Sequence, residues 1–379
     1  MKILQVTPFF SPLMGGAAEV PYQVSKELVK RGHQVTVYTS DYKLTRDYID
    51  SAPSVRVRPF KTWLSTASFY ITPGMIKATS EEIRNFDVVH MNNYRTFQNI
   101  VFRHYAKKFG IPYILHAYGS APRIISKQKL KLLYDKLWGY RILKDASRVI
   151  AAQLYEAGQY VGMGVDESKI TLVPNGINIE EYEQLPKKNT FRKKYGITEE
   201  HMVLFLGRIH KIKGIDILVK AVAELVRDGK DIKLVIIGAN DGYLPTLMEL
   251  IRELKIEENI TITGFVSSEM KKAAYVDADV YVLPSIYESF ATTILEAAAC
   301  GTPVIVTENC QIDYLVRKYF GLVSSHDEHG LKDAISNMLT NKKMRDKFGE
   351  NGKVIVRENY TWSHTIETIE NVYREVIKE

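Results

Sequence analysis

The chain lacks several features that would mark particular classes of protein. Its 379 residues include two cysteines, Cys300 and Cys310, with neither a paired framework nor metal-ligand spacing. We therefore expect buried thiols and no disulfide or structural zinc. No apolar run is long enough to span a bilayer, and the opening MKILQVTPFF is typical of a strand rather than of a signal sequence. These absences predict a cytoplasmic protein.

The G-x-G-x-x-G fingerprint of dinucleotide-binding domains is also missing. This argues against a nicotinamide-dependent oxidoreductase. Acidic residues are scarce in the first half of the chain: residues 1–170 carry 24 Lys and Arg against 13 Asp and Glu, a net charge of +11, whereas the remainder has a net charge of −4. The first half is therefore expected to meet an anionic partner, although we expect no nucleic acid.

Ten short apolar, β-branched runs alternate with helical patterns along the chain. They lie at 2–6, 33–39, 86–91, 111–117 and 147–152, and at 202–207, 233–238, 260–264, 279–285 and 302–307. Continuous apolar runs of this length are typical of buried parallel strands. The chain is longer than a domain with a single hydrophobic core usually is. The pattern therefore predicts an α/β fold of two doubly wound, Rossmann-like domains.

The break between the two domains is predicted near residues 170–182, where Pro174, Asn175 and Gly176 interrupt the pattern. We assign residues 1–170 to one domain and 171–362 to the other, and we expect an amphipathic helix at 363–379 to pack back on the first. Open parallel sheets bind ligands beyond the carboxyl ends of their strands, so two such domains predict an inter-domain cleft.

Glycines and cations follow two of the predicted strands. Gly15 and Gly16 lie between the first strand and its helix, where free amides favour an anion, although a turn without a ligand explains them about as well. Arg208 and Lys213 follow the strand that ends at Gly207. Two cations beside a helix N-terminus are unfavourable for the helix dipole, whose positive end lies there, but they are well placed to bind a diphosphate.

The stretch YESFATTILEAAACG places Glu288 in a loop and Glu296 in the first turns of a helix. Eight helical steps would separate the carboxylates by roughly 12 Å, more than the ~5 to 9.5 Å of paired glycosidase carboxylates. We therefore expect them to hold opposite ends of an elongated ligand. The amides of Ala291, Thr292 and Thr293 would bind phosphate oxygens between them.

Two further patterns are candidates for catalytic or metal sites. The D-x-D pair Asp277 and Asp279 precedes a strand, at the end opposite the ligand face, so we expect turn chemistry and no metal site. His90 and His116 are each predicted to close a strand of the first domain. A lone histidine is more often a packed core residue than a catalyst, but the pliable loop after His116 favours it as the catalytic one.

Together these motifs resemble a retaining GT-B glycosyltransferase of glycosyltransferase family 4, also called glycosyl transferases group 1. The resemblance covers nearly the whole chain, through GGAAEV, DVVHMNN, PNGIN, GRIHKIKG and ADVYVLPSIYESFATTILEAAACGTPVI. Two positions depart from the pattern: Asn92 stands where many relatives have a further histidine, and Ala291 replaces a frequent glycine of the phosphate loop.

The resemblance implies a role for each matching residue. The second domain would bind a nucleotide-diphosphate sugar, most often a UDP- or GDP-sugar, with Arg208 and Lys213 on the diphosphate, Glu296 on the ribose and Glu288 on the sugar hydroxyls. Glu288 and His116 would be the catalytic residues, and Gly15, Gly16 and the amides of Ala291, Thr292 and Thr293 would contact the donor. Such enzymes usually need no metal or other cofactor. A sugar-nucleotide epimerase of the same architecture and a catalytically silent nucleotide-sugar binding module remain as alternatives.

The segment at 126–148 combines leucines with seven cations. A stripe of Leu130, Leu133 and Leu137 flanked by Lys and Arg suits an interfacial helix on anionic lipid. A core stripe with a solvated face explains the same pattern nearly as well. We favour an anionic or lipid-linked acceptor that meets the first domain, with peripheral contact on the cytoplasmic membrane face.

Overall fold

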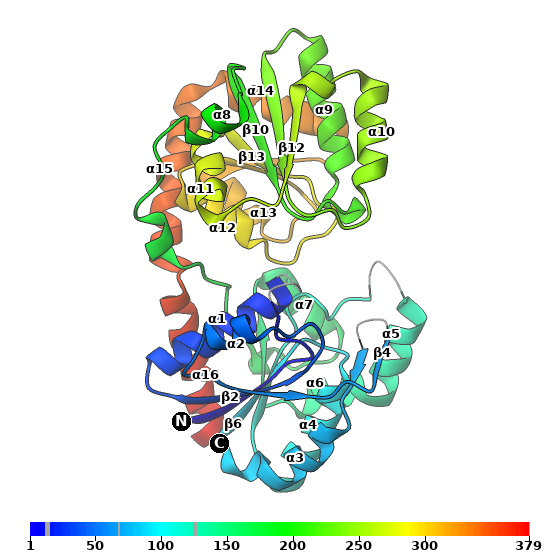
Figure 1. Cartoon of the computed structure of the whole chain (residues 1–379). Helices are drawn as coiled ribbons and strands as arrows, with labels where there is room; N and C mark the ends of the chain where they lie inside the picture. Colours follow the sequence, from blue (N-terminus) through cyan, green and yellow to red (C-terminus); the bar gives the residue numbers. More distant parts are fainter. Residues whose placement is uncertain (12–15, 67–68, 124–126, 379) are drawn as a thin grey trace. The chain divides into compact units, whose positions relative to one another are not determined.

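The computed structural model describes residues 1–11, 16–66, 69–123 and 127–378, which form two compact units (Figure 1). One unit contains Met1–Asn175 and the chain from Trp362 onward, and the other contains Gly176–Thr361. The first unit extends past residue 170 because strand β9 (Ile170–Leu172) pairs with β8 and belongs to its sheet. No helix of the described residues is both long and apolar enough to cross a bilayer.

A seven-stranded sheet in the order β3-β2-β1-β6-β7-β8-β9 forms the centre of the first unit, and every neighbouring pair is parallel. Its strands other than β9 are β1 (Lys2–Val6), β2 (Gln34–Ser40), β3 (Arg56–Phe60), β6 (Val88–Asn92), β7 (Tyr113–His116) and β8 (Arg148–Ala151). A separate antiparallel hairpin pairs β4 (Leu64–Thr66) with β5 (Phe69–Ile71). The helices are α1 (Gly16–Lys30), α2 (Arg46–Asp50), α3 (Gly74–Glu82), α4 (Phe97–Phe109), α5 (Gln128–Tyr134), α6 (Tyr140–Asp145), α7 (Leu154–Gly162) and α16 (Trp362–Lys378).

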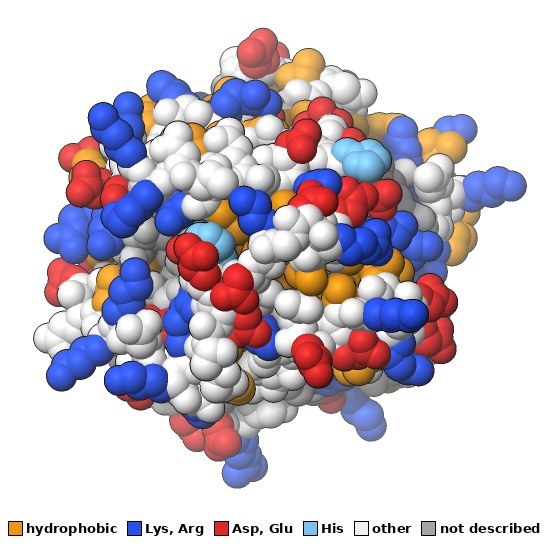
Figure 2. Space-filling view, turned by 90° about the horizontal axis from the view of Figure 1, so that it is seen from above, with side chains coloured by type: hydrophobic (Ala, Val, Ile, Leu, Met, Phe, Trp, Pro, Cys, Tyr) orange, Lys and Arg blue, Asp and Glu red, His pale blue; other side chains and the backbone are white. Residues whose placement is uncertain are grey.

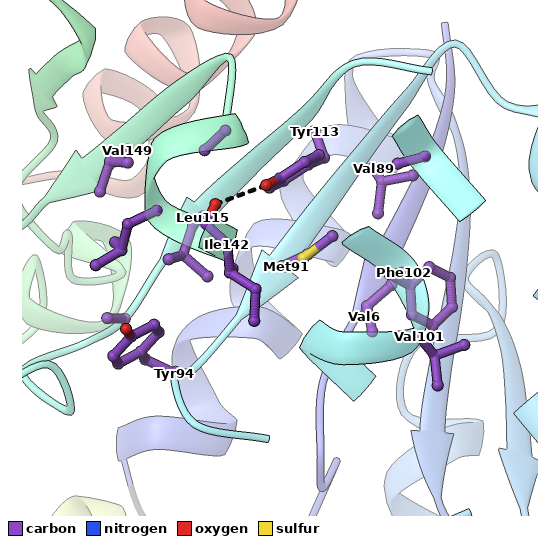
Figure 3. Packing of buried hydrophobic residues seen from close by; sticks show 14 of the residues in the cluster. Val6, Val89, Met91, Tyr94, Val101, Phe102, Tyr113, Leu115, Ile142 and Val149 are labelled. Carbon is purple, nitrogen blue, oxygen red and sulfur yellow. Dashed lines mark hydrogen bonds between the residues drawn. The ribbon is translucent and has the colours of Figure 1, made fainter. Parts of the chain in front are cut away.

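Both faces of this sheet are buried, which explains why its strands are continuous apolar runs. Successive side chains of a strand point to opposite faces. Leu4 and Val89 therefore pack with one cluster (Figure 3), in which the Tyr113 hydroxyl donates to the Ile142 carbonyl oxygen over 2.6 Å. Ile3 and Val88 pack with the other cluster, which includes residues of α1 and α16.

Helix α16 supplies a large share of that second cluster. Its apolar residues repeat at helical spacing and are buried: Trp362, Ile366, Ile369, Val372, Tyr373 and Val376. The Arg31 guanidinium donates to the Glu370 carboxylate over 3.1 Å, and the Thr365 hydroxyl donates to the Pro174 carbonyl over 2.9 Å. The end of the chain is therefore part of the core of the first unit.

The second unit has a six-stranded parallel sheet in the order β12-β11-β10-β13-β14-β15. Its strands are β10 (His201–Leu206), β11 (Ile232–Ile237), β12 (Ile260–Gly264), β13 (Val280–Leu283), β14 (Val304–Thr307) and β15 (Gly321–Ser324). The helices are α8 (Thr190–Tyr195), α9 (Ile215–Arg227), α10 (Leu244–Leu254), α11 (Ser268–Asp277), α12 (Thr292–Ala299), α13 (Asp313–Leu315), α14 (Glu328–Thr340) and α15 (Lys342–Asn359). Cys300 and Cys310 are buried free thiols, as predicted.

The ten predicted strands are all present, so the α/β class and the two Rossmann-like sheets are confirmed. The sequence did not reveal the edge strands β3, β9 and β15 or the hairpin strands β4 and β5. An edge strand is covered on fewer sides and tolerates charge and proline. β3 reads RVRPF, and its Pro59 pairs with Thr39 at the edge of the sheet.

Candidate functional site

Two loops meet at the carboxyl ends of β10 and β13 in the second unit. Gly214, the N-cap of α9, has a φ of 64°. A Cβ at this position would lie 2.0 Å from the Pro284 carbonyl oxygen, so only glycine allows the approach. The Ile286 amide donates to the Ile212 carbonyl over 2.8 Å. These contacts hold the loop that carries Lys213 against the loop that carries Glu288.

Lys213 and Glu288 form an ion pair in this corner, with the ammonium group donating to Glu288 Oε2. Each side chain retains 16 % exposure, so the pair is reachable from solvent but largely desolvated. The Glu288 carbonyl accepts from the Gln311 amide over 3.0 Å, which holds the loop to the segment after β14. Two residues that the sequence placed at one ligand therefore contact each other directly.

Helix α12 begins beside this pair, as predicted, with Thr292 as its first residue. Ala291 at its N-cap has φ −86° and ψ 106°, a conformation that any residue adopts, so replacing the family's frequent glycine needs no unusual backbone angle. Among the described side chains none caps this helix end, so its first amides are available to a ligand. The Tyr281 hydroxyl bonds the Thr293 hydroxyl over 2.8 Å and lies 3.1 Å from the Leu206 carbonyl, which orients the helix start.

Glu296, one turn further along α12, lies among partners that the sequence analysis missed. Its Oε1 accepts from Lys271 Nζ over 2.8 Å, and its Oε2 accepts from the Tyr275 hydroxyl over 3.2 Å. Burial and the nearby Glu296 carboxylate raise the pKa of Tyr182. Lys271 and Tyr275 lie on α11, more than 20 residues before Glu296, and belong to no motif that links them to it.

Arg208 lies at the start of the loop after β10 and is 62 % exposed. Its guanidinium pairs with Asp241, which follows β11 and is also well exposed. A pair in this position contributes little to stability, and the long side chain can leave it at low cost. The geometry therefore leaves Arg208 free to turn toward an anion.

The D-x-D carboxylates have structural partners, which are backbone amides of a helix start and of a strand rather than of the turn predicted for them. Asp277 is buried and accepts from the amides of Phe191 and Arg192 over 2.7 and 3.0 Å at the start of α8. Asp279 accepts from the Met202 amide over 2.9 Å. Both precede β13, at the end of the strand opposite the Lys213–Glu288 pair.

Among the described residues, one group of side chains has ligand atoms close enough to hold a metal ion: Glu224, Glu328 and His329. Lys332 pairs with Glu224 over 3.3 Å, and Lys220 lies 3.7 Å from Glu328, so cations already balance these acids. The group includes none of the predicted site residues.

In the first unit, His116 is the last residue of β7, as predicted. It is 1 % exposed, and among the described residues neither ring nitrogen has a hydrogen-bond partner. The ring lies against Tyr118, with 3.8 Å between ring centroids, and nearly parallel to His90 at 5.8 Å. Burial, and then the nearby His90, hold the pKa of His116 well below its ordinary value, so the imidazole is neutral at pH 7.

His90 does not close its strand, because β6 continues to Asn92; that prediction was wrong. The ring is fully buried, and its Nδ1 lies 2.7 Å from the Tyr373 hydroxyl of α16. Burial lowers the pKa of His90 to about 3. His90 is therefore the packed core residue that a lone histidine usually is.

Two contacts hold the loop after His116, where Tyr118 and Gly119 have positive φ angles of 51° and 74°. The Tyr118 hydroxyl donates to Asn92 Oδ1 over 2.6 Å. The Gly119 amide donates to Glu156 Oε1 over 2.7 Å, while Glu156 Oε2 accepts from the Ala152 amide over 2.8 Å. Glu156 is fully buried, and no sequence motif indicated it. A carboxylate near the start of a helix does not by itself indicate such a contact.

Of the predicted glycines, Gly16 begins α1, and Gly15 lies outside the described residues. Of the predicted lipid-facing segment 126–148, residue 126 also lies outside them. The alternative of a core stripe is not borne out, since Leu130, Leu133 and Leu137 are 63, 54 and 45 % exposed.

Comparisons with known proteins match both halves of the chain. A family model for Glycosyltransferase Family 4 matches residues 14–181, and one for Glycosyl transferases group 1 matches residues 187–354. The chain is 27 % identical to an uncharacterized glycosyltransferase of Methanocaldococcus jannaschii, over 99 % of this chain and 98 % of that protein. It is also 27 % identical to the D-inositol 3-phosphate glycosyltransferase of Nocardia farcinica, over 99 % of this chain and 89 % of that protein.

Solved structures share the fold. Anabaena HepE in complex with UDP superposes with a TM-score of 0.85 at 18 % identity, covering 99 % of this chain and 100 % of that one. The sucrose-phosphate synthase of Thermosynechococcus elongatus gives a TM-score of 0.80 at 21 % identity, covering 100 % and 99 %. These neighbours share the two Rossmann-like domains of the GT-B architecture. With the family models matched along nearly its whole length, the chain belongs to the group 1, family 4 glycosyltransferases.

Proposed function

We propose that this glycosyltransferase moves a sugar from a nucleotide-diphosphate sugar to a hydroxyl acceptor with retention of the anomeric configuration and without a metal. The second unit binds the donor in this proposal, and the first unit binds the acceptor. The observation that carries it is the Lys213–Glu288 ion pair beside the uncapped start of α12.

This pair suits a ligand that has both a diphosphate and hydroxyl groups. A desolvated cation without its carboxylate would be costly, so Glu288 balances Lys213 while the site is empty. An arriving diphosphate competes for the ammonium, and Glu288 is then free to accept hydrogen bonds from sugar hydroxyls. One exchange of partners thus couples recognition of the two halves of the donor.

The remaining donor contacts follow from the same corner of the sheet. The amides of Ala291, Thr292 and Thr293 bind phosphate oxygens at the positive end of α12. Arg208 turns from Asp241 to the diphosphate, and Glu296, oriented by Lys271 and Tyr275, accepts from the ribose hydroxyls. In this proposal Gly15 and Gly16 remain predicted donor contacts.

The chemistry is a front-face displacement at the anomeric carbon. The bond from this carbon to the leaving phosphate oxygen breaks, the acceptor oxygen bonds on the same face, and the acceptor proton passes to the departing diphosphate. Negative charge develops on the diphosphate in the transition state. Arg208 and Lys213 therefore contribute most to stabilising this transition state, in place of a metal ion. In this proposal the neutral His116, which is 1 % exposed, remains the predicted catalytic residue of the first unit.

Names of related proteins favour UDP as the nucleotide of the donor and an anionic acceptor. Anabaena HepE has been solved with UDP-glucose and with UDP and glucose. The relative from Nocardia farcinica is named for D-inositol 3-phosphate, and a relative from Schizosaccharomyces pombe is a phosphatidylinositol N-acetylglucosaminyltransferase subunit. We propose a phosphate-bearing or lipid-linked acceptor, reached on the cytoplasmic face of the membrane through residues 126–148.

Titration calorimetry tests the donor half directly. UDP, GDP and ADP are titrated into the wild-type chain and into Lys213→Ala, with Lys211→Ala as the matched control two residues earlier in the same loop. We expect one nucleotide to bind, and Lys213→Ala to weaken it while Lys211→Ala does not. Equal affinity of all three proteins for every nucleotide would refute the assignment. The anomeric configuration of the product, read by NMR, tests retention.

A further inference from the structure

The first unit buries a set of uncharged polar side chains near the carboxyl ends of β1 and β6. Charged side chains of both signs lie at the surface over the face drawn in Figure 2, where water can hydrate them. A buried polar group must instead find its partners within the protein. Gln5, His90, Asn92 and Tyr373 are all buried. None of these four side chains has a part in the proposed function.

Two backbone carbonyls fix the orientation of the Asn92 amide. Its Nδ2 lies 3.1 Å from the Val6 oxygen and 3.2 Å from the His90 oxygen, and a carbonyl oxygen can only accept. The same Nδ2 donates to Gln5 Oε1 over 2.7 Å. The other terminal atom of the amide, Oδ1, is therefore the one that accepts from the Tyr118 hydroxyl, over 2.6 Å.

The bonds beyond Gln5 have a direction for the same reason. Since Gln5 Oε1 accepts from Asn92, Gln5 Nε2 is the donor to the Tyr373 hydroxyl oxygen, over 3.2 Å. The Tyr373 proton then points to His90 Nδ1, 2.7 Å away. We call the side chains of Tyr118, Asn92, Gln5, Tyr373 and His90 the polar network. It joins the loop after β7 to α16 in the core of the first unit.

Tyr118 is the member of the polar network that lies closest to His116. The two rings have 3.8 Å between their centroids and an angle of 34° between their planes. Among the described residues neither nitrogen of His116 has a hydrogen-bond partner, so ring contacts rather than polar contacts hold the imidazole. Tyr118 has a φ of 51°, which is uncommon for a bulky residue and needs support from its surroundings. The bond from its hydroxyl to Asn92 is part of that support.

We propose that Asn92 and Tyr118 are positioning residues for His116. Asn92 fixes the Tyr118 hydroxyl, and the tethered Tyr118 ring holds the imidazole in one place at the end of β7. This gives a role to Asn92, which stands where many relatives have a histidine. The inference rests on the proposed function for the catalytic role of His116, but not for the placement of its ring.

Tyr118→Phe removes the tethering hydroxyl and keeps the ring. We expect kcat to fall roughly 10-fold, because a small displacement of a catalytic group is costly. The donor KM should stay at the wild-type value, because none of the proposed donor contacts depends on Tyr118. A donor KM that rises as kcat falls would make Tyr118 a structural residue and overturn the proposal.

Tyr113→Phe is the matched control. It also removes a buried tyrosine hydroxyl of the first unit, one that donates over 2.6 Å to the Ile142 carbonyl oxygen (Figure 3). Tyr113 is not part of the polar network, so this variant should turn over like wild type. An equal fall of kcat in Tyr113→Phe and Tyr118→Phe would show a general loss of packing and overturn the proposal.

Asn92→Ala removes the acceptor of the same hydrogen bond. We expect a similar fall in kcat, and we expect the double variant with Tyr118→Phe to be no slower than the slower single variant, because each change breaks the same bond. Losses that multiply in the double variant would overturn the pairing of the two residues. Thermal unfolding shows whether Asn92→Ala is folded, and if it is not, Tyr118→Phe decides the test.

Nuclear magnetic resonance of the His116 ring tests its placement without any substrate. An aromatic ring 3.8 Å away shifts the ring-proton signals of His116 through its ring current. In histidine-labelled protein, with His116→Gln to assign the signals, they should move in Tyr118→Phe and stay in place in Tyr113→Phe. Unchanged signals in Tyr118→Phe would overturn the proposal. Signals that move while kcat stays at the wild-type value would support the placement and refute only the catalytic role of His116.

Discussion

Lys213 donates a hydrogen bond to Glu288 across 75 residues of sequence, and neither side chain has more than 16 % exposure. We predict that Lys213→Ala and Glu288→Ala each lower turnover by at least ~10²-fold, the scale for losing one preorganised electrostatic contact. The double variant should lose much less than the product of the two, because the partners act as a unit. Steady-state kinetics of all four proteins checks this, and a fully additive loss would contradict it.

Glu296→Gln should raise the donor KM and leave kcat near wild type. The substitution keeps the shape of the side chain but removes the charge that Lys271 stabilises and one acceptor of ribose hydroxyls. Lys271→Ala, which leaves Glu296 in place without its cation, should raise the donor KM by a smaller factor. Donor saturation curves measure both, and a drop in kcat alone would move Glu296 from nucleotide binding to the chemical step.

Glu156→Gln should lower kcat roughly 10-fold, because an amide cannot accept from Gly119 and Ala152 with both of its terminal atoms. Glu156 contacts no substrate in this proposal, so the donor affinity of the variant should stay at the wild-type value. Glu167→Gln, an exposed glutamate of the same unit, is the control. If the variant weakens donor binding and kcat alike, Glu156 is structural rather than a positioning residue.

Acid should destabilise the first unit through its buried histidines. The pKa of His90 is lowered to about 3 in the folded chain, against 6.5 ordinarily, so between these values the unfolded state binds a proton that the folded state does not. Stability is therefore fully present above pH 6.5 and is lost as the pH falls toward 3, by up to about 1.4 kcal/mol per pH unit from this group. Denaturant unfolding between pH 7 and 4 measures the slope, and it should be shallower in His90→Gln. An unchanged slope in this variant would contradict the assignment to His90.

Activity should survive EDTA. Asp277 and Asp279 are occupied by backbone amides, and cations supply the charge at the proposed diphosphate site. Turnover is compared before and after chelation and after Mg²⁺ or Mn²⁺ is added back. Loss on chelation with recovery on Mn²⁺ would show that a metal takes part.

The buried strands could be predicted from the sequence. Both faces of each strand are covered, so nearly all of its side chains are apolar. β3 and β15 could not be predicted, since one edge is open to solvent and the side chains carry less of the core. β12 is an edge strand as well, but its sequence ITITG is still a β-branched run without charge. The corner of Lys213, Glu288 and α12 could be predicted because strand ends gather at one edge of a parallel sheet. Lys271 beside Glu296 and Glu156 beneath Gly119 could not, because each contact depends on tertiary packing between segments with no shared motif.

The chain leaves the first unit at Asn175 and returns to it at Trp362. During translation the second unit is therefore synthesised whole before α16 emerges from the ribosome. Until then Ile3, Val24 and Val88 lack the helix that covers them in the native core. A nascent chain must keep that apolar face from aggregating, and a stop codon before residue 362 should yield a protein that chaperones retain, even though every residue of the proposed active site has been made.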